Sequence, residues 1–460
     1  MKDLTQGSIT KALFQLAAFM MVSTIFQTLY FLADLYWVGR LGKEAVAAVG
    51  LAGNLMFVVL ALSQTLGVGT TTLISHAAGK KDKARINFVF NQSLTLSSMV
   101  GVVFAVIAFL MRDVYSQRMS ADAITATLST AYLTWFVPAM ALQFPLIAIG
   151  SALRGLGLIK PSMMISVATI ILNMALAPVL MFGWGTGHPL GVAGTAIATF
   201  LSVLVGVIAG IVYVEVGNSG LDFVPRAWPP HSETWGKMAK VGLPAGTEFA
   251  LMSLYMMLIY GIIRPFGSAA QAGFGIGARV MQAGFMPVIA IAFAAAPLAG
   301  QNFGARIGGR VRETFYAAAK FCTAITLVLT LLCHISPAWM IGLFSHDPEV
   351  VRFGSEYLRI ISWNFLASGL VFTTSSLFQG IGNTIPPLFS SVARMTLFAG
   401  PAVLISRVPN FQMRHLWYLA AATVIVQAVV NIWLLHREFD RKLNFADPMA
   451  MPASGLAAAE

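Results

Sequence analysis

Twelve long apolar segments dominate the sequence and limit the folds that it can adopt. Each has about twenty residues or more, the length that a helix needs to cross the hydrocarbon core of a bilayer. Charged residues make up only 10% of the chain, whereas soluble domains carry about 25%. We therefore predict an all-α polytopic membrane protein with twelve transmembrane helices, near 12–38, 46–74, 88–110, 126–150, 161–183, 190–214, 237–263, 270–298, 314–334, 354–378, 385–406 and 415–435.

The formal net charge of +11 comes from basic residues spread over the short connecting segments. They do not gather on one soluble surface, so we exclude nucleic acid as a partner. With the N-terminus inside, the inner loops, tails and adjoining helix ends carry 17 Lys and Arg, and the outer ones carry 9. Because basic loops stay on the cytoplasmic side, we expect both termini in the cytoplasm.

The two halves of the chain repeat each other at a constant offset of 225 residues. The offset pairs Gly79 with Gly304 and Gly155 with Gly380. Six predicted helices separate equivalent points, so both copies have the same orientation, as in transporters that rock two halves around a central site. The predicted units are an N-lobe at 1–214 with helices one to six, a cytoplasmic linker at 215–236, a C-lobe at 237–440 with helices seven to twelve, and a cytoplasmic tail at 441–460.

One carboxylate, Asp34, lies inside the first apolar segment. A charge at the centre of a membrane helix costs about 2.5–3.5 kcal/mol on insertion scales, so it usually faces a bundle interior or a water-filled cavity. An acid at the membrane rim is the alternative, which a continuous polar stripe on the same helix face disfavours. The stripe, at spacings of four, three, four and three, comprises Ser23, Gln27, Tyr30, Asp34 and Trp37.

Two further predicted helices of the first half present polar faces, and three such faces can enclose a hydrated pocket. Asn173 can donate to a carboxylate or accept from its protonated form. Ser and Thr in membrane helices often bond only to a carbonyl of their own helix, so a structural role stays open for them. The fifth helix carries Ser162, Ser166, Thr169 and Asn173, and the sixth carries Thr195, Thr199 and Ser202.

The second half has its own acid within an apolar segment, Glu248, at a position that is not equivalent to Asp34. Tyr255 lies seven residues later on the same helix face. The sequence has no Walker loop, no Rossmann fingerprint in a strand–helix setting and no His/Cys metal spacing. We therefore expect no cofactor, no metal site and no enzymatic activity, and any uphill transport has to draw on an ion gradient.

Five stretches together resemble the multidrug and toxic compound extrusion (MATE) family: Leu-Ala-Asp34-Leu-Tyr-Trp-Val-Gly39, Leu-Arg-Gly155-Leu-Gly157, Leu-Asn173-Met-Ala-Leu-Ala-Pro178, Gly191-Val-Ala-Gly-Thr-Ala-Ile-Ala-Thr199 and Phe-Gln-Gly380-Ile-Gly382. The resemblance covers the chain up to about residue 440. It implies an inner-membrane exporter of organic cations and other amphipaths, driven by inward H⁺ or Na⁺. It also implies that Asp34 is the coupling carboxylate of the first helix and that Asn173 and Thr199 are its polar partners.

The chain departs from the family pattern at three positions. One branch has a second N-lobe acid where this chain has Ala177. Another branch has a seventh-helix Glu where this chain has Met252, one turn beyond Glu248, and a tenth-helix Asp where this chain has Ser368. The C-lobe cation site is therefore incomplete, which shifts the expected coupling toward Asp34 and favours H⁺ over Na⁺.

We thus expect a monomeric, secondary active multidrug antiporter in the lipid bilayer, with small cationic or amphipathic molecules as substrates. The alternative is a flippase for lipid-linked precursors with the same superfamily architecture, which would need several basic residues in its lumen. The expected ion-coupling residues are Asp34, Asn173, Tyr30 and Thr199, and the expected substrate-binding residues are Asp34, Gln27, Thr169, Thr195, Glu248 and Tyr255.

Overall fold

The computed structural model describes residues 2–120, 122–185, 187–217 and 219–445, without the side chains at 31, 32, 35 and 54. Most of the predicted tail at 441–460 lies outside the described residues. Every regular element in the described part is a helix. These helices are α1 (Ile9–Gly39), α2 (Lys43–Gly79), α3 (Lys83–Met119), α4 (Ala123–Gly155), α5 (Ile159–Phe182), α6 (Gly191–Val216), α7 (Ser232–Ile263), α8 (Ser268–Gly304), α9 (Gly308–Ile335), α10 (Pro337–Gly342), α11 (Pro348–Ile361), α12 (Asn364–Ile381), α13 (Ile385–Ile405) and α14 (Met413–Lys442), with 3₁₀ turns at Pro225–Ala227 and Arg264–Phe266.

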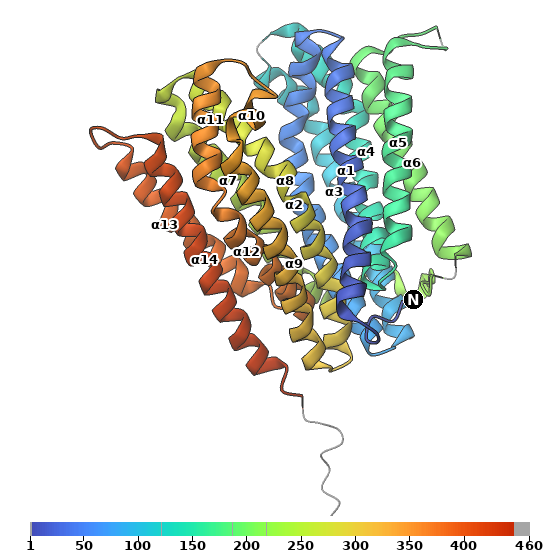
Figure 1. The fold of residues 1–460 in the computed structure, drawn as a ribbon. Helices are drawn as coiled ribbons and strands as arrows, with labels where there is room; N and C mark the ends of the chain where they lie inside the picture. Colours follow the sequence, from blue (N-terminus) through green and yellow to red (C-terminus); the bar gives the residue numbers. More distant parts are fainter. Residues whose placement is uncertain (1, 121, 186, 218, 446–460) are drawn as a thin grey trace, which may run out of the picture.

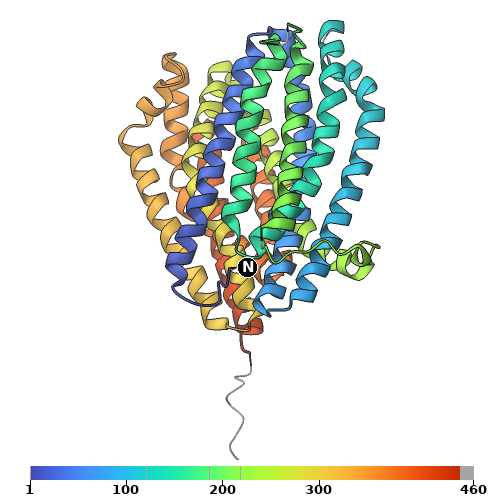
Figure 2. The same ribbon diagram turned by 90° about the vertical axis from the view of Figure 1, so that its right-hand side faces the viewer.

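The helices form two side-by-side bundles, α1–α6 and α7–α14, which correspond to the two predicted lobes (Figure 1). Helix α1 begins, and α14 ends, on the same face of the molecule, which we call the termini face (Figures 1 and 2). Short polar residues begin several helices: Asp82 accepts from the Arg85 amide at α3, and Asp122 accepts from the Thr125 amide at α4. Such caps satisfy backbone donors that a helix start leaves unpaired.

The number of candidate membrane spans agrees with the prediction, with one local difference. Eleven of the described helices are long and apolar enough to span a bilayer, and the number is twelve if α11 and α12, which meet at an angle of 56°, count as one broken span. The predicted continuous helix at 354–378 is therefore wrong in form. The break lies at Ser362, whose carbonyl accepts a hydrogen bond of 2.8 Å from the Thr330 hydroxyl of α9. A broken membrane helix is tolerated where neighbouring side chains satisfy the freed backbone.

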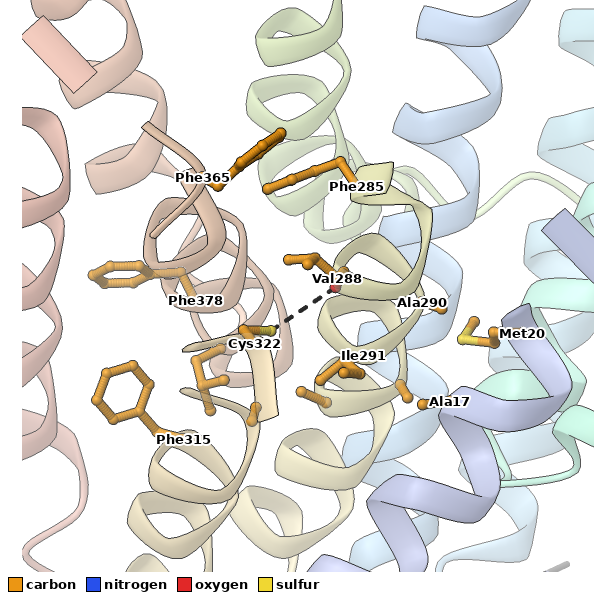
Figure 3. Packing of buried hydrophobic residues seen from close by; sticks show 14 of the residues in the cluster. Ala17, Met20, Phe285, Val288, Ala290, Ile291, Phe315, Cys322, Phe365 and Phe378 are labelled. Carbon is orange, nitrogen blue, oxygen red and sulfur yellow. Dashed lines mark hydrogen bonds between the residues drawn. The ribbon is translucent and has the colours of Figure 1, made fainter. Parts of the chain in front are cut away.

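Helix α1 belongs to both lobes. Its first half places Leu13, Ala17 and Met20 in the same buried cluster as residues of α8, including Ala290 and Ile291. Figure 3 shows Ala17 and Met20 approaching α8, while α9 and α12 pack on the other side of that helix. The second half of α1, with Val38, joins a separate buried cluster of N-lobe residues. One end of α1 is therefore fixed to the C-lobe and the other lies in the N-lobe.

Helices α2 and α8 cross at the termini face with almost no space between their backbones. A Cβ atom on Gly79 would overlap the Gln301 carbonyl oxygen, and one on Gly304 would overlap the His76 carbonyl oxygen. These two contacts are equivalent, because 225 residues separate Gly79 from Gly304 and His76 from Gln301. The internal repeat thus appears in space as a symmetric crossing, which small residues make possible.

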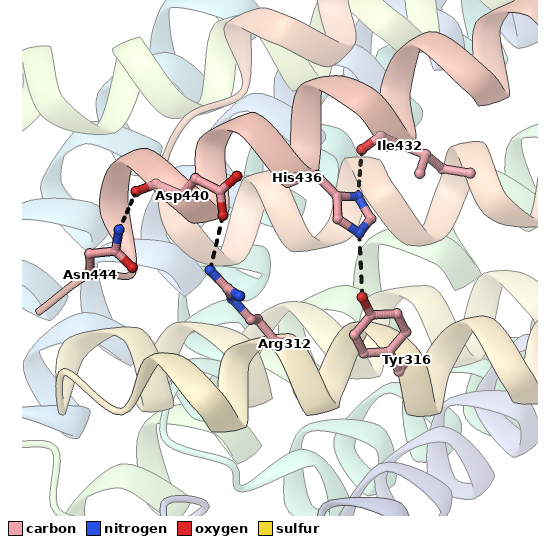
Figure 4. Close-up of polar contacts among 6 residues, drawn as sticks. All are labelled: Arg312, Tyr316, Ile432, His436, Asp440 and Asn444. Carbon is pink, nitrogen blue, oxygen red and sulfur yellow. Dashed lines mark hydrogen bonds and ion pairs between the residues drawn. The ribbon is translucent and has the colours of Figure 1, made fainter.

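At the same face, α9 and α14 are joined by polar contacts (Figure 4). The Arg312 guanidinium donates to the Asp440 carboxylate at 3.1 Å, and the Tyr316 hydroxyl lies 3.3 Å from the His436 imidazole. These contacts tie the last helix to the C-lobe. Each is largely exposed, so its contribution to stability is small.

We expect Gly79→Ala to lower the thermal unfolding midpoint of the detergent-solubilised protein, because the added methyl group has to displace the backbone of α8. Overpacking a tight contact costs about 1–3 kcal/mol. Gly53→Ala on the same helix is the matched control, since a Cβ there meets no atom within 4 Å. Equal midpoints for the two variants would contradict the described packing of α2 against α8.

Candidate functional site

A cavity of about 510 Å³ lies mainly within the N-lobe, and α8 and the end of α12 complete its wall. The predicted polar stripe of α1 reaches it, because Ser23, Gln27 and Tyr30 line the cavity. Asp34 follows one turn beyond Tyr30 and is not among the lining residues. Trp37, the last member of the stripe, instead packs edge-on against Phe182, with ring centroids 6.0 Å apart.

Asp34 is held by α6. The Thr195 hydroxyl donates to its Oδ1 at 3.1 Å, and Asp34 is half-buried while Thr195 is fully buried. The predicted partner Asn173 donates instead to the Thr199 hydroxyl at 3.0 Å, one turn further along α6. The Thr199 hydroxyl in turn donates to the Thr195 carbonyl. Asp34 and Asn173 are therefore connected through adjacent turns of α6.

Asn173 has an unused acceptor. Its Oδ1 atom is buried and has no hydrogen-bond partner among the described residues. Most buried polar side-chain atoms in folded proteins have a hydrogen-bond partner. A protonated carboxyl group becomes a donor, so this oxygen could accept a hydrogen bond that an ionised carboxylate cannot supply.

Two tyrosines accompany the carboxylate. The Tyr30 side chain interacts with Thr199 and, electrostatically, with Asp34. Tyr132 of α4 is also within electrostatic range of Asp34 and Tyr30. Tyr132 was not predicted as a site residue, although Thr125 and Ser129 precede it on the same face of α4.

The predicted Ser and Thr residues differ in what their hydroxyl groups contact. Thr195 contacts Asp34 and does not line the cavity. Thr169 and Ser166 line the cavity, but each hydroxyl donates to the carbonyl four residues earlier, at 2.9 and 3.1 Å. In this structure the hydroxyl groups of these two residues therefore bond only to a carbonyl of their own helix, which is the structural role that the sequence left open.

The C-lobe holds a separate polar cluster around Glu248. Its Oε1 accepts from the Ser391 hydroxyl at 3.2 Å, and Gln427 donates to that same hydroxyl at 3.0 Å. Tyr255 lies under the guanidinium of Arg394, 4.7 Å from the ring centroid. Neither Glu248 nor Tyr255 lines the N-lobe cavity, so the structure does not bring these two predicted substrate-binding residues together with Asp34.

The cavity is closed toward the termini face by hydrogen bonds between the lobes. The His76 Nε2 atom lies 2.6 Å from the Gly380 carbonyl oxygen, to which it donates. The Gln301 amide donates to the Gly155 carbonyl at 3.0 Å. Both donors and both acceptors are related by the offset of 225 residues. We call this pair of hydrogen bonds, with the α2–α8 crossing, the seam.

The seam is reinforced by the segment before α1. The Leu4 amide donates to Gln301 Oε1 at 3.0 Å, and the Lys2 amide donates to the Leu156 carbonyl at 3.1 Å. The Leu4 side chain is completely buried. This segment therefore links the end of α4 in one lobe to α8 in the other. Among the described residues, no group of three or more His, Cys, Asp and Glu could hold a metal ion.

A family model described as MatE matches residues 20–179 and 244–404, one match in each lobe. The chain is 26% identical to the "Probable multidrug resistance protein YoeA" of Bacillus subtilis, over 88% of this chain and 89% of that protein. It is 24% identical to the "Multidrug export protein MepA" of Staphylococcus aureus, over 82% of this chain and 83% of that protein.

Solved structures show the same fold. One, described as the outward-facing conformation of a multidrug resistance MATE family transporter of the MOP superfamily, superposes with a TM-score of 0.88 at 26% identity over 96% of this chain and 98% of that chain. Another, a MOP superfamily transporter from Pyrococcus furiosus described by the reverse polarity of its binding pocket, has the same TM-score, identity and coverage.

We expect Thr195→Val to lower the unfolding midpoint, because the Asp34 carboxylate then lacks the Thr195 donor inside the bundle. An unsatisfied partner of a buried hydrogen bond costs about 1–3 kcal/mol. Thr169→Val, with the same change of shape, is the matched control, since its hydroxyl bonds only within its own helix. A loss as large in Thr169→Val would contradict a special role for the bond to Asp34.

Proposed function

The chain belongs to the MATE family of multidrug transporters, and we propose that it exports amphipathic organic compounds, cations among them, in exchange for H⁺. The observation that carries this proposal is a carboxylate, Asp34, held by Thr195 one helical turn beyond Tyr30, which lines a cavity that the seam closes toward the termini face. The multidrug resistance and export proteins similar to the chain support a small-molecule cargo. The excess of basic residues at the termini face supports its placement in the cytoplasm, with the chain in the inner membrane.

The proposed coupling ion is H⁺, and Na⁺ is the competing ion. A cation site needs several oxygen ligands, and the position where one family branch has a second acid is Ala177, which is buried and apolar. A proton needs only the carboxylate and an acceptor. The Asn173 Oδ1 atom of α5 is an acceptor without a partner among the described residues, and its side chain is linked to Asp34 through Thr199 and Thr195 of α6. This difference favours protonation of Asp34 over its coordination to a metal ion.

The proposed transport step follows from the position of α1. Protonation removes the charge on Asp34, weakens its attraction for the Thr195 donor and lets the second half of α1 repack against α5 and α6. Because the first half of α1 is fixed to α8, this repacking acts on the contact between the lobes. Deprotonation reverses the change, and a cationic substrate favours the deprotonated state.

The seam is the barrier that separates the cavity from the termini face and that has to open during alternating access. In this state the two lobes touch at the termini face, and their ribbons diverge toward the opposite face (Figure 1). The neighbour described as outward-facing supports the same assignment for this chain. Opening toward the cytoplasm has to break the His76 and Gln301 hydrogen bonds and separate the glycine crossing. Since the two halves of the seam are equivalent, a small rotation of the lobes about their common axis breaks both together.

The flippase alternative receives less support from the cavity. A lumen for a pyrophosphate headgroup would need several basic residues, and among the described lining residues Arg154 is the only one. Arg394 stacks on Tyr255 in the C-lobe, and Arg279 is exposed, so neither adds charge to this cavity. The lining fits a drug-sized amphipath better than a diphosphate-linked lipid.

We expect Asp34→Asn to abolish efflux and drug resistance in cells while the protein still folds and inserts, because the change removes the titratable charge but keeps the side-chain size. Resistance and dye efflux are compared at equal expression. Glu248→Gln is the matched comparison, an acid-to-amide change in the other lobe, and is expected to alter substrate range more than coupling. Wild-type efflux by Asp34→Asn, or an equally complete loss in Glu248→Gln, would contradict this assignment.

We also expect substrate binding to release protons from the detergent-solubilised protein. A ligand shifts a protonation equilibrium only if its affinities for the two states differ, and the coupling is reciprocal. Proton release is measured in weak buffer between pH 5 and 8 on addition of a cationic dye. No release from the wild type, or the same release from Asp34→Asn, would overturn the mechanism.

A further inference from the structure

Arg154 is the one residue with a formal charge among the described residues that line the cavity. It lies at the end of α4 near the termini face, and the other described lining residues are apolar or neutral. Its guanidinium donates to the Ser151 hydroxyl at 2.6 Å, and none of the ion pairs among the described residues includes it. A guanidinium has five N–H donors and is always charged. Most of its donors therefore have no partner among the described residues, and the side chain is half-buried at the cavity wall.

Two glycines lie beside the guanidinium of Arg154. A Cβ on Gly150 would lie 3.4 Å from the Nη1 atom of Arg154, and one on Gly67 would lie 4.0 Å from the Nη2 atom. Gly67 itself lines the cavity. The guanidinium thus sits in a slot between α2 and α4, with a side open to the cavity.

The opposite wall supplies a second polar group. Gln379 of α12 lines the cavity, and it is the repeat equivalent of Arg154, 225 residues later. The two lobes therefore bring equivalent positions to the same end of the cavity, one with a guanidinium and one with an amide. An amide can donate one more hydrogen bond to a group that the guanidinium binds.

The length of the cavity separates this end from Asp34. Met140 and Arg154 both line it and are fourteen residues apart on α4, which corresponds to about 21 Å along a helix. Tyr30, next to Asp34, lines the cavity, whereas Asp34 does not. The neutral wall between the ends carries Met56, Met163 and Phe293, which fit an apolar body.

We propose that Arg154 binds an acidic group of the transported molecule, so that the preferred substrates are amphipaths with a carboxylate or sulfonate at the end nearest the cytoplasm. A carboxylate matches the planar fork of a guanidinium in a bidentate pair. The inference rests on the proposed function, since it concerns the cavity through which transport is proposed. In a zwitterion, the acidic group lies at Arg154 and a cationic group lies toward Tyr30 and Asp34.

The test uses two dyes that differ only in the acid: rhodamine B, with a free carboxylate, and its ethyl ester. Binding to the purified full-length protein in phosphatidylcholine nanodiscs is measured by fluorescence anisotropy. We expect the wild type to bind the acid about tenfold or more tightly than the ester, as expected for a hydrogen bond to a charged group. Arg154→Gln should lose this preference with little change for the ester, and Arg154→Lys should keep part of it. Arg279→Gln, an exposed change on α8, should behave like the wild type.

Equal affinities for acid and ester in the wild type, or an unchanged preference in Arg154→Gln, would overturn the inference. The wild-type comparison stands without any variant, so a misfolded Arg154→Gln protein does not block the test. If phosphatidylglycerol nanodiscs remove the preference for the acid, Arg154 holds an anionic lipid headgroup and the proposal is likewise overturned. Export of the ester without preference for the acid leaves the proposed function intact. Failure of both dyes to bind removes the basis of the inference and contradicts the proposed function as well.

Discussion

The backbone crossing of α2 and α8 is the constraint on which the rest of the structure depends. Glycines at equivalent positions let the two helices touch, and the His76 and Gln301 side chains then reach carbonyls of the opposite lobe. The crossing closes the cavity on one face. A carrier that moves solutes uphill must never open to both sides at once, and in the proposed mechanism this contact supplies one of the two barriers.

The second constraint is a charge placed in an apolar bundle. Asp34 costs free energy unless it is hydrated, paired or protonated, and here Thr195 partly compensates it. The same helix is anchored at its other end to α8 by Leu13, Ala17 and Met20. In the proposed mechanism, a change in the protonation of Asp34 therefore acts on a helix that reaches the contact between the lobes. Arg154 lies at the end of the cavity near the termini face.

Much of this architecture could be predicted from the sequence. The length of each apolar segment is a local property of the chain, and the internal repeat is found by comparing the sequence with itself. Three residues of the predicted polar stripe on α1, Ser23, Gln27 and Tyr30, line the cavity. The partner of Asp34 could not be predicted: Asn173 and Thr195 are both polar residues of the first lobe, and only the rotation of α5 and α6 decides between them. The break at Ser362 and the proximity of Tyr132 depend on neighbouring helices. Arg154 was not predicted as a site residue, since the sequence does not show that the cavity extends as far as the end of α4.

The most direct test of the account is transport by purified protein in proteoliposomes under imposed gradients. A cationic dye is followed under a pH gradient, then under a Na⁺ gradient at equal pH, for the wild type and for Asp34→Asn. The account predicts wild-type transport driven by the pH gradient alone and none by the Asp34→Asn variant. Transport that follows the Na⁺ gradient, or that persists under the pH gradient without the Asp34 carboxylate, would contradict it.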